Sequence, residues 1–84
     1  MKKWEYLFIR VDYFAGDLRP SSVNGEEFRD KQAVPPLYTF VNKLGEDGWE
    51  AVGMNYTPSH GYGFLILKRP QESSIIDDVK NHPD

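Results

Sequence analysis

Seven consecutive residues, Leu44-Gly45-Glu46-Asp47-Gly48-Trp49-Glu50, constrain the fold more than any other stretch of this chain. Gly48 fits the position just past a helix end, where a left-handed backbone is cheap only without a Cβ atom. In the Schellman arrangement that follows, the Trp49 amide donates to the Leu44 carbonyl, and the Gly48 amide donates to the Gly45 carbonyl. The sequence therefore predicts a helix that ends here and leads at once into a strand.

Trp49 follows this turn and has two interpretations. It is either a platform on which a ligand stacks or a clamp that packs on Leu44 and fixes the angle between helix and strand. We favour the clamp, because the residue after a cap glycine commonly packs on the third-from-last helical residue. Gly45 has no side chain, and we expect it where the helix and the strand lie close together.

A helix precedes the turn, and strands flank it on both sides. Pro35-Pro36 suits a helix start, and apolar residues then recur at the i, i+3, i+4 and i+7 spacing of one helix face. These residues are Leu37, Phe40, Val41 and Leu44. Three stretches rich in aromatic and β-branched residues predict long strands. They are Lys3 to Phe14, Trp49 to Tyr56 and Tyr62 to Arg69. We expect the last of these strands to lie between the other two.

The segment between the first strand and the helix allows alternatives at two places. Leu18 to Val23 is expected to run back along the first strand, as an edge strand or an irregular segment, because it contains Pro20. Val23-Asn24-Gly25-Glu26 fits either a two-residue hairpin turn or a surface loop. The sequence thus predicts an α+β fold, in which an antiparallel sheet of three to four strands packs on one helix around a β-α-β-β core.

Residues 1–70 are predicted to form a single domain, and residues 71–84 a tail or a short helix. Ser74 and Asp77 resemble a helix-capping pair, and Ile75 and Val79 share a helical face. A helix of one or two turns is marginal by itself, so we expect it to be either frayed or docked on a neighbouring surface.

Composition argues against several classes of function. The chain of 84 residues has no cysteine and two histidines, which excludes thiolate and multi-histidine metal sites. Its net charge is −3 and its basic residues are scattered, which argues against a nucleic-acid partner. No stretch is long and apolar enough to span a membrane, and Glu5 and Arg10 interrupt the segment that resembles a signal peptide. We therefore expect a cytoplasmic protein with no membrane partner and no cofactor.

Two places offer side chains that catalysis could use, and neither fits. Ser59 and His60 are adjacent, and adjacent side chains rarely converge as a nucleophile and its base, which also need a third group to orient the histidine. Glu26 and Glu27 lie in a run of mixed charge with no histidine nearby, which is typical of a solvated face. We predict that the protein is not an enzyme.

Both faces of the predicted sheet are apolar, and one helix covers only one face. If the aliphatic side chains face the helix, an aromatic set faces outward; the reverse assignment would leave the aliphatic set outward. The aromatic set is Trp4, Tyr6, Phe8, Phe64 and Ile66. Because a monomer rarely exposes so many large side chains together, we favour self-association through this face, as a homodimer or a higher oligomer. The alternative is cover from within the chain, by residues 15–34 or by the C-terminal helix.

Four basic residues come together if the first and last strands pair antiparallel. They are Lys2, Lys3, Lys68 and Arg69. This cluster could hold an anion, with Trp4, Tyr6 and Tyr62 around a pocket, which makes a small-molecule or anion-binding protein the alternative function. The simpler explanation is that these charges keep the protein soluble and protect a sheet edge.

Four motifs follow one another along the chain. They are Trp4-Glu5-Tyr6, Val23-Asn24-Gly25, Leu44 to Glu50 followed by Val52, and Lys68-Arg69-Pro70. Their order and spacing resemble a family of small bacterial and phage proteins that is catalogued only as a domain of unknown function. The resemblance covers Lys3 to Pro70, and Ala51 stands where the family more often has leucine. It implies a compact β-α-β-β unit and no known activity, so no catalytic residue carries over.

Overall fold

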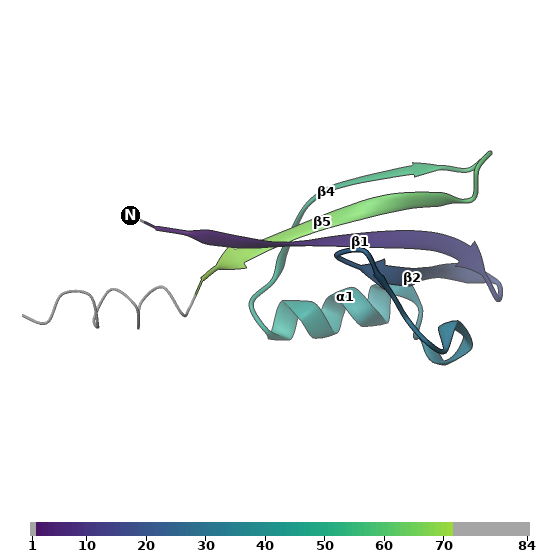
Figure 1. Ribbon diagram of the computed structural model, residues 1–84, viewed down its shortest axis with the longest axis horizontal. Coiled ribbons are helices and arrows are strands. Elements are labelled where there is room, and N and C mark those ends of the chain that lie inside the picture. Colours follow the sequence, from purple (N-terminus) through teal and green to yellow (C-terminus); the bar gives the residue numbers. More distant parts are fainter. Residues whose placement is uncertain (1, 72–84) are drawn as a thin grey trace, which may run out of the picture.

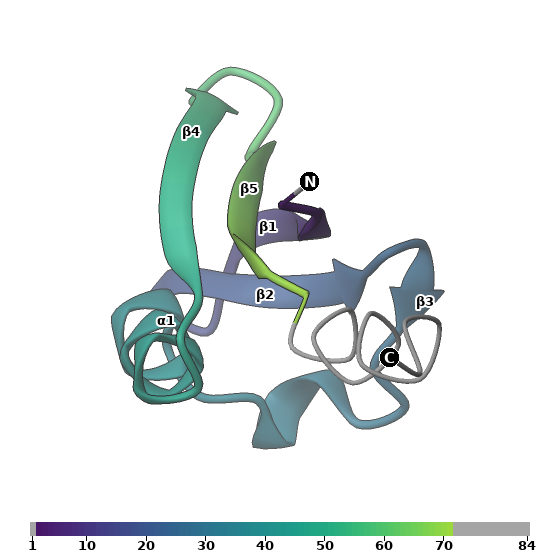
Figure 2. The same cartoon turned by 90° about the vertical axis from the view of Figure 1, so that its left-hand side faces the viewer.

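The computed structural model of the protein describes residues 2–71 and contains one sheet and one α-helix (Figure 1). The elements are β1 (Trp4–Phe14), β2 (Asp17–Val23), β3 (Glu26–Glu27), the 3-10 helix η1 (Lys31–Ala33), α1 (Leu37–Glu46), β4 (Glu50–Thr57) and β5 (Tyr62–Pro70). The strands pair antiparallel in the order β3-β2-β1-β5-β4. The sheet is strongly twisted, so that β4 and β5 rise away from α1 while β2 lies across it (Figure 2).

The predicted α+β class and the antiparallel sheet with one helix are confirmed, and β5 lies between β1 and β4 as expected. The predicted number of strands is too low, because residues 2–71 form five. The additional strand is β3, which pairs Glu26 with Val23 across the Asn24-Gly25 turn. Both turn residues have positive φ, +50° and +85°, as a two-residue hairpin requires, so the hairpin alternative is correct. The predicted C-terminal helix lies outside the described residues.

The end of α1 has the predicted hydrogen bonds. The Trp49 amide donates to the Leu44 carbonyl and the Gly48 amide to the Gly45 carbonyl, both at 3.0 Å. Gly48 has a φ of +93°, which is the left-handed backbone that this turn needs. Because the turn is so tight, β4 begins at Glu50, four residues after the helix ends at Glu46. The turn thereby fixes where the chain leaves the helix layer and enters the sheet.

The expected role of Gly45 is wrong. A Cβ atom at Gly45 would meet no atom within 4 Å, and the residue is exposed, so no close approach of helix and strand requires it. The close approach is at Gly63 instead. A Cβ atom there would lie 2.0 Å from the Asn55 carbonyl oxygen on the neighbouring strand β4. The sequence pattern does not reveal this, because the approach depends on the twist of a strand pair.

The core is small and lies between the sheet and α1. Its buried centre comes from the two neighbouring strands β1 and β5. It consists of Ile9, Val11, Leu65 and Leu67. The apolar stripe of α1 packs on this centre, yet every residue of α1, all of which the structure describes, retains some exposure. The helix therefore covers the sheet without being enclosed by it.

The segment that follows β3 packs beside α1. The Phe28 ring meets the Phe40 ring edge to face at 5.8 Å, and Val34 is buried. Arg19 of β2 donates to the Val34 carbonyl at 2.9 Å and to the Phe14 carbonyl at 3.2 Å. This arginine ties the β1–β2 turn to the start of the helix, a role that no sequence motif indicates.

Pro20 is an edge residue, as expected, and also a core residue, which was not expected. β3 pairs only with Ser22 and Val23, so the outer edge of β2 is unpaired at Pro20 and no ladder bond is lost there. Its ring is nevertheless fully buried. The neighbouring Ser21 is an extra residue in the ladder, because Arg10 pairs with Ser22 and Val11 with Pro20.

Candidate functional site

The sheet face turned away from α1, here called the outer face, carries the aromatic set. Tyr6 lies opposite Lys68, Phe8 opposite Ile66, and Phe64 opposite Arg10 across the β1–β5 ladder. The alternate residues of the same strands form the core under α1. Of the two possible assignments, the structure therefore has the aliphatic side chains facing the helix and the aromatic set facing outward.

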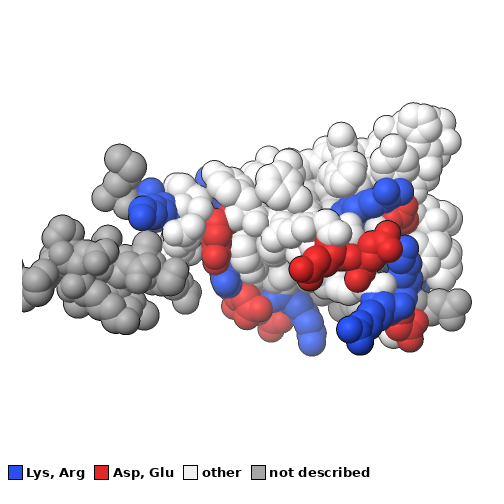
Figure 3. All heavy atoms as spheres, in the orientation of Figure 1, with Lys and Arg blue, Asp and Glu red and all other residues white. Residues whose placement is uncertain are grey.

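The aromatic side chains of the outer face are unusually exposed. Phe8 is 52% exposed, Tyr6 49%, Phe64 44% and Trp4 37%, whereas Ile66 between them is half-buried. In the view of Figure 3, charged side chains gather over α1, β2 and the segment after it, while uncharged surface covers most of β4 and β5. The outer face thus combines large apolar rings with little charge at its centre.

Cations border these rings. The ammonium groups of Lys2 and Lys68 lie 5.0 and 4.4 Å from the centre of the Trp4 ring, and the Arg10 guanidinium lies 4.4 Å from the Tyr62 ring. Each distance is within the range of a cation–π interaction. Trp4 and Tyr62, the rings at the two ends of the outer face, therefore each contact a cation. Tyr6, Phe8 and Phe64 form the aromatic middle of the face between them.

The structure does not bring the four predicted basic residues together. Lys2 and Lys68 share the Trp4 ring, but Arg69 is on the opposite face because consecutive strand residues alternate. Lys3 is exposed, and its carbonyl accepts a hydrogen bond from the Gln71 amide at 3.0 Å. The anion site that the sequence suggested is thus reduced to two lysines beside one ring.

Arg69 has a structural role instead. Its guanidinium forms an ion pair with Glu5, donates to the Asp47 carbonyl at 2.8 Å, and lies 4.3 Å from the centre of the Trp49 ring. Trp49 in turn packs against the core cluster that Leu44 also contacts. Trp49 therefore joins the helix end to β5 and is engaged on its ring face by Arg69, which supports the clamp rather than a ligand platform.

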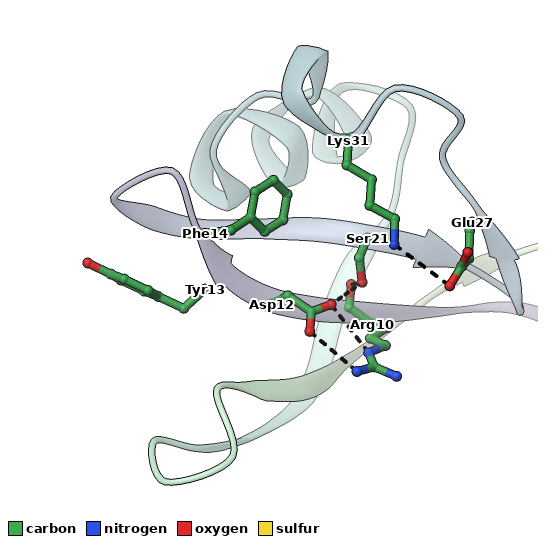
Figure 4. Close-up of a pocket in the computed structure, with 7 residues that line it drawn as sticks. All are labelled: Arg10, Asp12, Tyr13, Phe14, Ser21, Glu27 and Lys31. Carbon is green, nitrogen blue, oxygen red and sulfur yellow. Dashed lines mark hydrogen bonds and ion pairs between the residues drawn. The ribbon is translucent and has the colours of Figure 1, made fainter.

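A polar hollow of about 350 Å³ lies at the β1–β2 end of the sheet (Figure 4). It is lined by Arg10, Asp12, Tyr13, Phe14, Ser21, Glu27 and Lys31. The buried hydroxyl of Ser21 donates to the Asp12 carboxylate, which also pairs with Arg10 at 3.2 Å. Lys31 lies 3.8 Å from Glu27. The charges in the hollow are therefore already paired with one another. No sequence motif indicates this hollow, because the Ser21 bulge creates it.

The Ser59-His60 loop is an ordinary turn between β4 and β5. The amides of His60 and Gly61 both donate to the Thr57 carbonyl at 3.0 Å. The His60 ring stacks on Tyr62 at 6.0 Å. In the part of the chain that the structure describes, no group of three or more acidic, histidine or cysteine side chains is placed to hold a metal ion.

Comparisons with protein-family models, with curated proteins and with solved structures find no match to this chain. The family resemblance of the four sequence motifs therefore remains a prediction. Within residues 2–71, no helix has the length and apolar character needed to cross a membrane.

Proposed function

We propose that the protein is a non-enzymatic interaction module that associates with copies of itself through the outer face. The observation that carries this proposal is the exposure of Tyr6, Phe8 and Phe64 side by side on a regular sheet. Contiguous apolar patches of this kind on small proteins commonly mark interaction sites. The proposal includes a cytoplasmic location and neither nucleic acid nor membrane as a partner, and these parts rest on the sequence.

The small core gives self-association a physical reason. Four buried side chains form the centre of the sheet–helix core, and α1 stays partly exposed. A chain of this length buries only about 60% of its unfolded surface, so added burial has a large relative effect. An interface of ordinary size buries about 800 Å² on each partner. At ~25 cal/mol per Å² its apolar part contributes on the order of 20 kcal/mol before the cost of association.

Cover of the outer face by residues 15–34 is the alternative that the fold disfavours. That segment packs on the helix side, through Phe28 against Phe40 and through buried Val34. It contributes Glu27 and Lys31 only to the polar hollow at one end of the sheet. Residues 15–34 therefore leave the aromatic middle of the outer face exposed.

A second candidate function is binding of a small anionic molecule at Trp4. The observation that favours it is the pair of ammonium groups, from Lys2 and Lys68, within 5.0 Å of one indole ring. A flat anionic ligand could stack on the ring and pair with both lysines. Titration of the tryptophan fluorescence with inorganic phosphate and with an aromatic carboxylate tests this function, and Trp4→Phe separates the Trp4 signal from that of Trp49. An unchanged signal up to millimolar concentration would remove it.

The experiment that tests self-association is light scattering across a dilution series, which gives the absolute mass in solution. We expect a mass of twice the chain mass of 9.7 kDa, or a higher multiple, that falls towards the monomer only on strong dilution. A single-chain mass at every concentration would rule out self-association and direct attention to the Trp4 site.

A further inference from the structure

The two edges of the sheet differ in length and charge. One edge ends in β3, which has two residues, both glutamates. The other edge is β4, whose eight residues pair only with β5 within residues 2–71. The outer side of β4 therefore presents a row of backbone donors and acceptors. Proteins usually protect such a row with lysine, proline, a bulge or an acidic side chain.

The protection on β4 is confined to its first half. Glu50 begins the strand, and a bulge follows, because Ala51 pairs with Leu67 and Gly53 with Ile66, which leaves Val52 as an extra residue. From Gly53 to Thr57 the strand contains no charge, no proline and no bulge, and Pro58 comes directly after it. Five consecutive residues are thus regular, uncharged and open on one side.

Apolar hollows lie beside this stretch on both faces of the sheet. On the outer face, Gly53, Met54, Asn55, Phe64 and Ile66 line a hollow of about 240 Å³. On the helix side, Met54 and Leu65 border a hollow of about 350 Å³ that α1 lines with Leu37, Tyr38 and Val41. A strand added at the β4 edge would place its alternate side chains over these two hollows.

We propose that β4 pairs antiparallel with β4 of a second copy, about a two-fold axis perpendicular to the sheet at Asn55. This register uses the whole regular stretch. It sets Gly53 opposite Thr57 of the second copy, and Met54 opposite Tyr56 of the second copy, with Asn55 opposite itself. Met54 and Tyr56 share the helix-side face, since they pair with Leu65 and Gly63 of β5. Their side chains would therefore meet beside the hollow on the helix side of the sheet.

A second copy fits this edge better than a repeating chain of copies. Head-to-tail stacking would need β4 to pair with the opposite edge, where β3 is short and carries two carboxylates and the open part of β2 contains Pro20 and the Ser21 bulge. Pairing of β4 with itself uses the long, regular edge stretch of each copy within residues 2–71, so the assembly closes as a dimer. The dimer joins two sheets of five strands edge to edge. It leaves the outer faces open, so the inference is independent of the proposed function.

The absence of cysteine from the chain gives a direct test. In Asn55→Cys the two new thiols face each other across the axis, at a cross-strand distance that suits a disulfide. Asn42→Cys, at an exposed position of α1, is the matched control. Under mild oxidation we expect Asn55→Cys to form a covalent dimer at least tenfold faster than Asn42→Cys.

A second measurement keeps the test valid if Asn55→Cys folds poorly, because the Asn55 side chain accepts a hydrogen bond from the Phe64 amide. In the unaltered protein, the amides of Gly53 to Thr57 that point away from β5 should become protected from hydrogen exchange as the protein concentration rises. Cross-linking at the control rate together with no concentration-dependent protection would overturn the inference.

The outcomes for the edge and for the outer face can be separated. An association that Tyr6→Ser abolishes, with no protection at the β4 edge, would support the outer face and overturn the edge. Concentration-dependent protection at the edge, with the dilution curve unchanged by Tyr6→Ser, would support the edge and overturn the outer face.

Discussion

Asn24 and Phe8 exchange two hydrogen bonds between a hairpin turn and the middle of β1. The Asn24 amide donates to the Phe8 carbonyl at 2.8 Å, and the Asn24 side-chain oxygen accepts from the Phe8 amide at 2.9 Å. The turn residue thereby continues the β1–β2 ladder by one position. Phe8 is at the centre of the outer face, so this pair fixes the strand on which the proposed interface lies.

Two substitutions of Asn24 should therefore lower the free energy of unfolding by different amounts. Asn24→Gly retains the positive φ and loses only the side-chain acceptor, so we expect a loss of about 1 kcal/mol in the free energy of unfolding. Asn24→Ala also forces an alanine into the left-handed backbone, and the loss should reach about 2 kcal/mol. Urea unfolding of the two variants measures both values. Equal losses would show that the backbone conformation contributes nothing.

Ala15 is the other non-glycine residue with positive φ, at +54°, among those described. The left-handed backbone costs alanine about 1 kcal/mol, whereas asparagine tolerates it better. We therefore expect Ala15→Asn to raise the free energy of unfolding by about 0.5 kcal/mol. The control is Ala33→Asn, at an exposed position without positive φ. An equal gain from the control would point to a general surface effect.

Substitution by alanine should have opposite effects on stability at Gly63 and at Gly45. A Cβ atom at Gly63 would overlap the Asn55 carbonyl, so Gly63→Ala should force β4 and β5 apart and cost at least about 3 kcal/mol. At Gly45 the space is open and the residue is helical, so Gly45→Ala should stabilise by about 0.5–1 kcal/mol. Thermal unfolding compares them directly, and destabilisation by Gly45→Ala would contradict the geometry.

Arg69 and Lys68 are adjacent and basic, but Arg69 joins three parts of the fold, whereas the Lys68 ammonium lies over the exposed Trp4 ring. Arg69→Ala removes the Glu5 ion pair, the bond to the Asp47 carbonyl and the contact with the Trp49 ring. We expect a loss of about 1–2 kcal/mol, since partial exposure screens the ion pair. Lys68→Ala should change stability by less than about 0.5 kcal/mol. Denaturant unfolding of both variants measures the two losses. Equal losses would show that Arg69 contributes no more to stability than Lys68.

Self-association through the outer face should depend on which tyrosine is removed. Tyr6 is 49% exposed on the outer face, and Tyr13 is 59% exposed at the far end of β1, where alternation from Val11 places it on the opposite face of the strand. We expect Tyr6→Ser to weaken the association at least tenfold, and Tyr13→Ser to leave it unchanged. Light scattering over a dilution series gives both affinities. Equal weakening would move the interface away from the outer face.

Most of the fold could be predicted because its signals are local. The Gly48 turn, the Leu37 to Leu44 stripe of α1 and the period-two faces of β1 each depend on residues that are close in sequence. The features that were missed depend on contacts between distant segments. The approach of Gly63 to Asn55 and the reach of Arg19 to Val34 both follow from the twist and stacking of elements, which no spacing rule contains.

In the candidate site, too, the placement of residues could be predicted only where it depends on neighbours in the sequence. Alternation along the strands correctly grouped Tyr6, Phe8 and Phe64. The basic cluster was grouped by its nearness to strand ends, without regard to alternation, and Arg69 consequently belongs to the other face. The polar hollow escaped notice because it depends on Ser21, a bulge residue that shifts the register by one position.

The central position of β1 has a consequence for how the chain folds. β1 leaves the ribosome well before β5, its neighbour on one side, and the Glu5–Arg69 ion pair joins residues 64 positions apart. A β1–β2 hairpin can form early, but one edge of β1 then waits for the β4–β5 hairpin. Such high contact order slows folding. The nascent chain therefore holds an aromatic strand with an open edge until the β4–β5 hairpin has formed, and at that stage the edge can pair with another chain.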